Sequence, residues 1–377
     1  MKNKCRALCV FGTRPEAIKM APVVNALNRS PRFITKVCVT GQHREMLDQV
    51  LTLFAIKPDF DFSLMRHAQG LTDITCQVLT KMQELFDKWC PDWVLVHGDT
   101  TTTFAAAMAA FYHKIPVGHV EAGLRTGDIY SPWPEEINRR ITSLVTGLHF
   151  APTATARQNL LSEGVDSKDI AITGNSVIDA LVSVKEKIAC DAILRLELDR
   201  QLSYLPDDKH IILVTGHRRE NFGPGLRSIC QAILQLARCR RDVHIVYPVH
   251  PNPNVSGLVY DMLADNPAIS LIPPLDYLPF VYLMMRAHII LTDSGGVQEE
   301  APTLGKPVLV LRDTSERPEA IEAGTVIMVG TSTKKILSVT QSLLTDSRAY
   351  SRMSVLHNPY GDGHAAERIV SVLGKRV

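Results

Sequence analysis

The segment Ala287-His288-Ile289-Ile290-Leu291-Thr292-Asp293, followed by Ser294-Gly295-Gly296-Val297-Gln298-Glu299-Glu300, carries the clearest fold signal of the chain. Its first half is a short continuous apolar run, which is typical of a strand buried in a parallel sheet. Its second half predicts a tight turn and a short helix. This arrangement places free backbone N–H groups around a concave spot that attracts a phosphate oxygen. An ordinary glycine-containing turn remains the alternative.

Strand-like runs alternate with helical stretches along the whole chain. The predicted strands cover residues 7–13, 36–40, 93–98, 116–120, 148–151, 169–173, 210–215, 244–248, 270–272, 289–292, 307–311 and 325–329. Many of these runs are continuously apolar, as expected for strands that helices cover on both faces. The pattern therefore predicts an α/β protein with doubly wound, Rossmann-like folding.

The length of 377 residues is typical of two domains. A long helical stretch at 176–208 separates the two sets of strands, so we predict one domain at 1–175 and a second at 176–357. A final helix is expected from about residue 364. Two facing Rossmann-like domains would bind a ligand in the cleft at the carboxyl edges of their strands.

The composition excludes several classes of protein. A net charge of +2, from 41 basic and 39 acidic residues, argues against nucleic-acid or membrane-surface binding. The N-terminal apolar run, 7–11, is too short for a signal peptide, so we expect a cytoplasmic protein. Eight cysteines without a C-x-x-C pair predict buried free thiols and no metal site.

Charged residues follow the predicted strands of the first half. Arg14 and Lys19 place positive charge near a helix start, where they would anchor a phosphate or substrate; a solvated side chain is the alternative. Asp99 either caps a helix or points into the cleft. We interpret Glu121, beside a glycine-bearing loop, as functional. Glu135 suits a helix start, where acids complement the helix dipole, but it could also face the cleft.

The second half offers a histidine and a carboxylate. His217 follows the strand at 210–215 and is a candidate general acid–base or phosphate-binding residue, with a surface loop histidine as the alternative. Glu300 follows the Ser-Gly-Gly turn by about one helical turn, where it could accept hydrogen bonds from sugar hydroxyls. A phosphate site next to a ribose site suggests a nucleotide or a nucleotide sugar.

Two near-motifs are discounted. Asp59-Phe60-Asp61 has the spacing used for metal–diphosphate binding, but we find no strand-to-loop context for it and interpret it as chance. Gly223-Pro224-Gly225 lacks the third glycine of a dinucleotide fingerprint. The sequence therefore predicts no nicotinamide cofactor.

Several segments together closely resemble the non-hydrolysing UDP-N-acetylglucosamine 2-epimerases of bacteria. They occur in the family's order and span nearly the whole chain. The segments are 11–19 (FGTRPEAIK), 41–47 (GQHREML), 97–102 (HGDTTT), 120–126 (VEAGLRT), 132–136 (PWPEE), 215–221 (TGHRREN), 292–296 (TDSGG) and 357–363 (HNPYGDG).

The resemblance implies the GT-B fold, with the last helix (about 364–377) packing back on the first domain, and a homodimer. It implies interconversion of UDP-GlcNAc and UDP-ManNAc for cell-surface polysaccharide. The C2 proton of the sugar is not next to a carbonyl, so a base alone cannot remove it readily. One solution is transient oxidation, but no nicotinamide signature is present. The other is elimination of UDP to a glycal followed by re-addition, and the resemblance implies this second route, without a cofactor.

The resemblance also implies roles for individual residues. Acid–base and leaving-group chemistry would fall to Asp99, Glu121, Glu135 and His217. Substrate binding would fall to Arg14, Lys19, Phe280, Ser294, Gly295, Gly296, Glu300 and Arg317, with Phe280 near the uracil and Glu300 at the ribose. Which carboxylate takes which proton stays open.

Many bacterial members bind a second UDP-GlcNAc as an allosteric activator. Candidates for that site are Gln42, His43, Arg218 and His250. Glu45 stands where activator-dependent relatives often carry glutamine, which puts this property in doubt. A GT-B glycosyltransferase, a hydrolysing epimerase and a silent UDP-sugar sensor remain as alternative functions.

Overall fold

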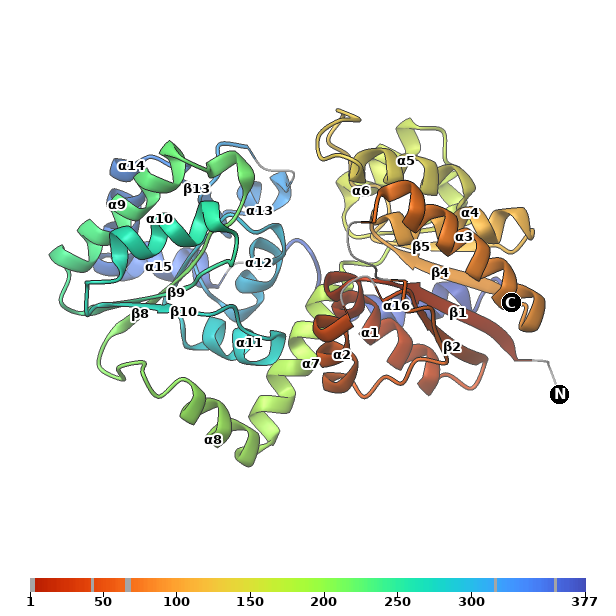
Figure 1. Cartoon of the computed structure of the whole chain (residues 1–377), viewed down its shortest axis with the longest axis horizontal. Helices are drawn as coiled ribbons and strands as arrows, with labels where there is room; N and C mark the ends of the chain where they lie inside the picture. The colour runs from red at the N-terminus through yellow and green to blue at the C-terminus, as the bar shows by residue number, and fades with distance from the viewer. Residues whose placement is uncertain (1–3, 42–43, 65–68, 315–316, 356–357) are drawn as a thin grey trace. The chain divides into compact units, whose positions relative to one another are not determined.

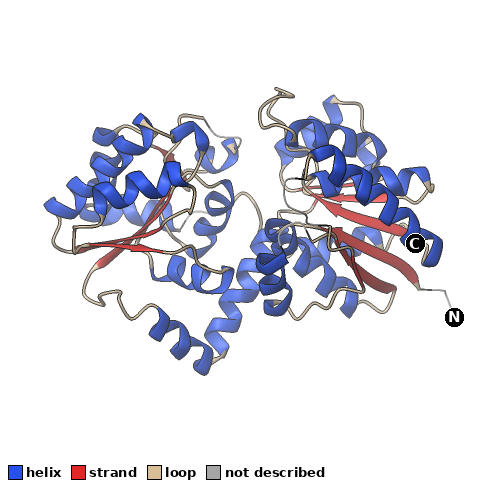
Figure 2. Cartoon of the chain, viewed as in Figure 1, coloured by secondary structure: helices blue, strands red, loops and turns tan. Residues whose placement is uncertain are grey.

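The computed structural model describes residues 4–41, 44–64, 69–314, 317–355 and 358–377. The chain divides into two units, the first containing residues 1–180 and 360–377 and the second containing residues 181–359. In each unit a central sheet is flanked by helices (Figures 1 and 2). Helix α7, Ser176–Cys190, contains the point at which the two units divide.

The first unit is built on a parallel sheet with the strand order β3-β2-β1-β4-β5-β6-β7. Its strands are β1 (Cys5–Phe11), β2 (Phe33–Val39), β3 (Phe60–Asp61), β4 (Trp93–His97), β5 (Val117–Val120), β6 (Leu148–Ala151) and β7 (Ile170–Ile172). Its helices are α1 (Arg14–Arg29), α2 (Arg44–Leu53), α3 (Leu71–Lys88), α4 (Thr101–Tyr112), α5 (Glu135–Val145), α6 (Ala154–Ser162) and α16 (Ala365–Leu373). The carboxylate of Asp179 accepts hydrogen bonds from the backbone N–H groups of Ala365 and Ala366, which fixes the start of α16 in this unit.

The second unit repeats the plan with the strand order β10-β9-β8-β11-β12-β13. Its strands are β8 (His210–Thr215), β9 (Val243–Pro248), β10 (Ile269–Ile272), β11 (Ile289–Thr292), β12 (Val308–Val310) and β13 (Val326–Met328). Its helices are α8 (Ala192–Gln201), α9 (Pro224–Cys239), α10 (Pro253–Leu263), α11 (Tyr277–Arg286), α12 (Gly295–Glu300), α13 (Pro318–Glu322), α14 (Thr333–Thr345) and α15 (Ser347–Ser354).

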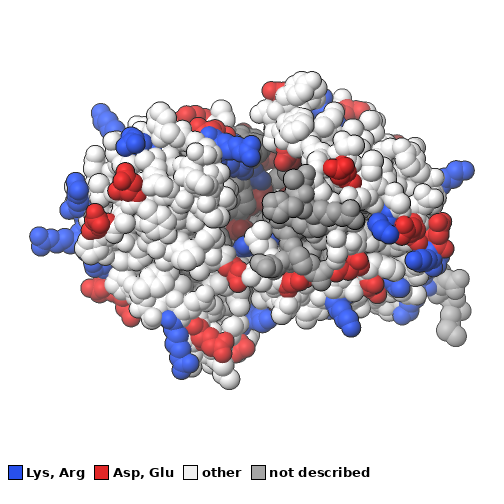
Figure 3. Space-filling model, viewed as in Figure 1, with Lys and Arg blue, Asp and Glu red and all other residues white. Residues whose placement is uncertain are grey.

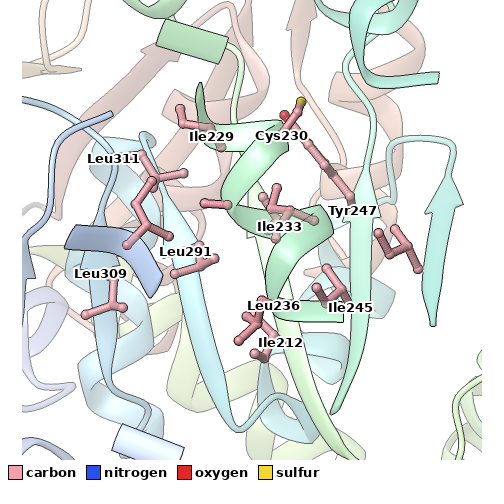
Figure 4. Packing of buried hydrophobic residues seen from close by; sticks show 14 of the residues in the cluster. Ile212, Ile229, Cys230, Ile233, Leu236, Ile245, Tyr247, Leu291, Leu309 and Leu311 are labelled. Atoms are coloured by element: carbon pink, nitrogen blue, oxygen red, sulfur yellow. The ribbon is translucent and has the colours of Figure 1, made fainter. Parts of the chain in front are cut away.

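Helix α9 shows how the core of the second unit forms. Its apolar side chains recur every three or four residues, so they share one face of the helix. Ile229, Ile233 and Leu236 from this face pack with Ile212 and Leu291 of the sheet, all at most 1% exposed (Figure 4). Truncation of such a side chain to alanine typically costs about 2–5 kcal/mol of stability.

The expected doubly wound α/β fold is confirmed in both units, because each sheet is parallel and its strand order reverses next to its first strand. The reversal lies between β1 and β4 in the first unit and between β8 and β11 in the second. In open α/β sheets, ligands bind at the carboxyl ends of the strands beside such a reversal. The loops that follow β1, β4, β8 and β11 are therefore the places to look for a site.

The structure corrects the interpretation of the segment 59–61. Phe60–Asp61 forms the edge strand β3, paired with β2, so the segment does have a strand context, which the sequence analysis did not find. Only two residues pair, which is too few for a recognisable apolar pattern. Both carboxylates serve the local backbone: Asp59 accepts from Val37 N at 2.9 Å, and Asp61 accepts from Ser63 N at 3.0 Å.

The predicted burial of the cysteines is only half right. All eight are free thiols, but only Cys5, Cys9, Cys38 and Cys230 are buried. The exposed thiols lie on helices or just after them, where no sheet covers them: Cys76, Cys90, Cys190 and Cys239.

The surface carries charges of both signs. On the visible face of each unit, basic and acidic side chains are interspersed, in keeping with the small net charge (Figure 3). None of the helices in the described part of the chain has the length and apolar character that a membrane span requires.

Candidate functional site

The turn after β1 is organised by a buried carboxylate. Thr13 caps α1, and Glu16 completes a capping box by accepting from the backbone of Gly12 and Thr13 at 3.1 and 2.8 Å. The other oxygen of Glu16 accepts from the Thr100 hydroxyl at 2.7 Å, in the loop after β4. Burial raises the pKa of this carboxyl, while these hydrogen bonds oppose the shift. Glu16 thus ties the turn that precedes Arg14 to the loop that carries Asp99.

Asp99 does not cap helix α4. Thr100 is the cap, since its side chain accepts from the backbone N–H of Thr103. Asp99 instead accepts two hydrogen bonds from Arg139, at 2.7 and 2.9 Å. Arg139 also donates to the fully buried Glu136 at 2.9 Å. The capping alternative is therefore wrong, and a guanidinium fixes the direction of the Asp99 carboxylate.

Glu121 has a carboxylate that is held by partners from several elements of the first unit. It follows β5 directly with a φ of 64°, a left-handed conformation that is uncommon for a residue with a side chain. Its side chain is 8% exposed and contacts the ammonium of Lys19. Asn175 Nδ2 donates to its Oε1 at 2.7 Å, and His97 Nε2 lies 3.5 Å from its Oε2. Backbone strain persists where the surroundings over-determine a conformation, which is typical of functional sites.

Glu135 and Glu136 begin helix α5, as predicted, but they have different surroundings. Glu136 accepts from the backbone N–H of Thr126 at 3.2 Å and pairs with Arg139, so its role is structural. Glu135 Oε2 is buried and has no hydrogen-bond partner among the described residues. Of the two, only Glu136 has both carboxylate oxygens engaged by described residues.

In the second unit, Asp293 positions His217. Its Oδ2 accepts from the backbone N–H groups of His217 and Arg218 at 2.8 and 2.9 Å, and its Oδ1 lies 3.4 Å from His217 Nδ1. Partial burial lowers the pKa of the His217 imidazole, Asp293 raises it, and the neighbouring His250 and Arg218 lower it. The rings of His217 and His250 stack at 5.3 Å between centroids. The imidazole is thus held in a fixed orientation.

The Ser-Gly-Gly turn brings a cation against its backbone. A Cβ added to Gly295 would lie only 2.4 Å from the Arg317 guanidinium, so glycine is needed for this close approach. Arg317 Nε also donates to the buried Glu299 at 2.7 Å. Glu300 accepts from the Tyr277 hydroxyl at 2.7 Å. Backbone amides and a guanidinium therefore lie together after β11, with a carboxylate one turn further on.

The structure places each remaining candidate in its unit. Arg14 is the first residue of α1, Phe280 lies half-buried on α11, and Ser294 and Gly296 flank the close contact at Gly295. Gln42 and His43 lie outside the described residues.

The sequence analysis missed the residues that hold the candidates in place: Glu16, Glu136, Arg139, Asn175, Asp293 and Glu299. Only Glu16 had a usable local signal, the Thr-x-x-Glu spacing of a capping box.

Known proteins resemble the chain over almost its full length. The family described as UDP-N-acetylglucosamine 2-epimerase matches residues 25–374. The UDP-N-acetylglucosamine 2-epimerases of Yersinia pestis and Escherichia coli K12 are 58% and 57% identical over 368 residues, covering 98% of this chain and of each relative.

Solved structures of UDP-GlcNAc 2-epimerases also resemble this chain. The UDP-GlcNAc 2-epimerase of Neisseria meningitidis bound to UDP-GlcNAc superposes with a TM-score of 0.93 at 52% identity, covering 98% of this chain and 100% of that one. The Methanocaldococcus jannaschii UDP-GlcNAc 2-epimerase in complex with UDP-GlcNAc and UDP gives 0.83 at 33% identity, covering 98% and 99%. These matches confirm the resemblance found in the sequence and the GT-B-like class of the two α/β units. The chain belongs to the UDP-N-acetylglucosamine 2-epimerase family.

Proposed function

We propose that this protein interconverts UDP-GlcNAc and UDP-ManNAc by inverting C2 of the sugar without net hydrolysis. The observation that carries the proposal is the carboxylate of Glu121, buried, strained and fixed by Lys19 and Asn175 at the carboxyl end of a central strand. Membership of the family, with close relatives named for this reaction, supports the same substrate.

The reaction we propose is elimination followed by re-addition. The C2 proton departs as the C1–O bond to UDP breaks, which leaves a glycal and free UDP. A proton is then delivered to the opposite face of C2 while a UDP oxygen re-forms the bond to C1. Atoms and charges balance, and no external oxidant is needed.

Acid–base work in this scheme falls to side chains whose directions are fixed. Asp99 is aimed by Arg139, and Glu121 by Lys19 and Asn175. Glu135 keeps a buried oxygen without a partner among the described residues. Two carboxylates in different surroundings can hold different pKa values and so divide the roles of acid and base.

UDP binding is assigned to groups that favour anions and sugar hydroxyls. Arg317, the amides at Gly295 and Gly296, and Arg14 would bind the diphosphate. Glu300 would accept from the ribose hydroxyls, and Phe280 would pack against uracil. His217, partly buried and oriented by Asp293, would give or take a proton at the leaving diphosphate.

We further propose that a second molecule of UDP-GlcNAc activates the enzyme. The stacking of His250 on His217 supports a route by which a second UDP-GlcNAc near Arg218 and His250 would alter catalysis. A titration that shows hyperbolic kinetics at every UDP-GlcNAc concentration would contradict activation.

We also propose a homodimer, which sedimentation would test, and a role in supplying ManNAc for surface polysaccharide. The free thiols support a reducing compartment such as the cytoplasm.

The deciding experiment supplies UDP-GlcNAc to the purified protein without any sugar acceptor. The proposal expects UDP-ManNAc to accumulate to an equilibrium mixture, with Glu121→Gln as the matched inactive control. A product that forms only when an acceptor is added would indicate a glycosyltransferase. Release of free ManNAc with stoichiometric UDP would indicate the hydrolysing reaction.

A further inference from the structure

A buried histidine without a hydrogen-bond partner lies beside the Glu121 carboxylate. His97 is the last residue of β4 and is 3% exposed. Its Nε2 lies 3.5 Å from Glu121 Oε2, yet neither ring nitrogen makes a hydrogen bond to any residue that the structure describes. Buried polar atoms are nearly always paired, so an unpaired imidazole at this place calls for a functional explanation.

The imidazole of His97 is neutral at ordinary pH. Desolvation lowers its pKa to about 4, and the neighbouring Lys19 ammonium acts in the same direction, against the opposing effect of Glu121. His119, on the adjacent strand, is also buried and neutral, with a pKa lowered to about 3. A neutral imidazole carries one N–H and has one nitrogen free to accept a hydrogen bond. His97 therefore adds no charge next to Glu121 but offers an acceptor.

Glu121 needs different partners in its two protonation states. Lys19 and Asn175 both donate to Oε1, so they stabilise the ionised carboxylate. A carboxylic acid formed by uptake of the substrate proton has an O–H that must find an acceptor in this buried place. The nitrogen of His97 lies on the Oε2 side, away from those donors. The carboxyl group thus has a partner ready for each state.

We propose that His97 is a positioning residue for the reaction, in which its neutral ring accepts the hydrogen bond of protonated Glu121 and so allows that carboxyl to take the substrate proton. This inference rests on the proposed function, since it presumes that Glu121 exchanges a proton with the sugar. His97 touches no reacting atom in this scheme. Its effect acts through the geometry and proton affinity of Glu121.

Two substitutions separate hydrogen bonding from space filling. His97→Phe keeps a planar ring of similar size but removes both nitrogens, whereas His97→Gln fits the space less well but keeps an amide oxygen that can accept. His149→Phe is the matched control, because His149 is a buried histidine, 1% exposed, on β6, which β5 separates from β4 in the same sheet. His97→Leu serves as a second apolar variant if phenylalanine prevents folding.

Steady-state epimerisation of UDP-GlcNAc and thermal melting are measured for each variant. We expect His97→Phe to lower kcat about tenfold or more with KM within about threefold, and His97→Gln to recover much of the loss. His149→Phe should leave kcat near the wild-type value. A packing role predicts the reverse order, with Phe tolerated better than Gln, and that order would overturn the inference.

Failure of the inference and failure of the proposed function give different results. If His97 has no such role, the wild type turns over, Glu121→Gln is inactive and His97→Phe retains full kcat. If the proposed function is wrong, the wild type makes no UDP-ManNAc or Glu121→Gln remains fully active, and the His97 inference falls with it.

Discussion

Substitution of Gly295 by alanine tests whether Arg317 binds the nucleotide. The added Cβ would lie 2.4 Å from Nη1, 2.7 Å from Cζ and 3.0 Å from Nη2 of Arg317. Distances under 3.0 Å do not occur between real atoms of these kinds, so one group must move. The guanidinium is the end of a flexible side chain, so it moves more easily than the backbone of α12. The variant should therefore displace Arg317 without unfolding the second unit.

The expected loss is mainly in binding. A hydrogen bond to a charged group contributes about 1.5–3 kcal/mol. Loss of one such bond between Arg317 and a phosphate oxygen would weaken the Kd for UDP by roughly 10- to 100-fold. The displaced side chain also strains its bond to Glu299, while alanine favours a helix over glycine by up to ~1 kcal/mol. These effects oppose each other, so the melting temperature should change by only a few degrees.

Calorimetric titration of UDP into the wild type and the Gly295→Ala variant measures this loss. Gly257→Ala is the matched control, because Gly257 lies on the exposed side of α10 and its added Cβ meets nothing within 4 Å. That control should bind UDP like the wild type. If Gly295→Ala also binds within about twofold of the wild type, Arg317 is not a nucleotide ligand and the assignment of the Ser-Gly-Gly turn fails.

Two further predictions follow from the first unit and from His217. Replacement of one acid–base side chain should lower kcat by ~10²-fold or more in steady-state kinetics. Circular dichroism should show that the variant is still folded. The variants are Asp99→Asn, Glu121→Gln and His217→Asn, and wild-type rates in all three would refute the assigned roles. Stability should also fall as the pH drops from about 6.5 towards 4, because burial lowers the pKa of three histidines in the folded state while the unfolded chain takes up protons near 6.5. These are His97 (about 4), His119 (about 3) and His149 (about 4). Urea denaturation at pH 5.0 should give a free energy of unfolding at least ~2 kcal/mol lower than at pH 7.5. An unchanged urea midpoint would contradict the conclusion that these three histidines are buried and neutral.

The sheets were largely predictable from the sequence because buried parallel strands are continuous apolar runs. The strands at 148–151, 210–215 and 289–292 match the predicted bounds. β3 was missed because two residues at a sheet edge carry no periodic signal. The stretch at 176–208 was expected as one long helical segment but contains two helices, with Asp191 capping the second.

The candidate site was only partly predictable. Residues directly after strands, such as Glu121 and His217, could be predicted as site residues because ligands bind at the carboxyl ends of parallel strands. The residues that hydrogen-bond to them could not be predicted, because Asn175 lies 54 residues from Glu121, and Asp293 lies 76 residues from His217. Contacts of that range depend on the parallel crossover topology, which brings distant strand ends together. The sequence analysis included His97 only as part of the segment 97–102, because nothing in the neighbouring sequence indicates a buried imidazole without a hydrogen-bond partner.

The most direct test of the central claim is epimerisation in deuterated water. UDP-GlcNAc is incubated with the protein alone, and the UDP-ManNAc formed is examined by proton NMR and mass spectrometry. Loss and return of the C2 proton predict one deuterium at C2 of the product. Product that keeps protium at C2 would contradict proton removal by the Glu121 site and, with it, the elimination route.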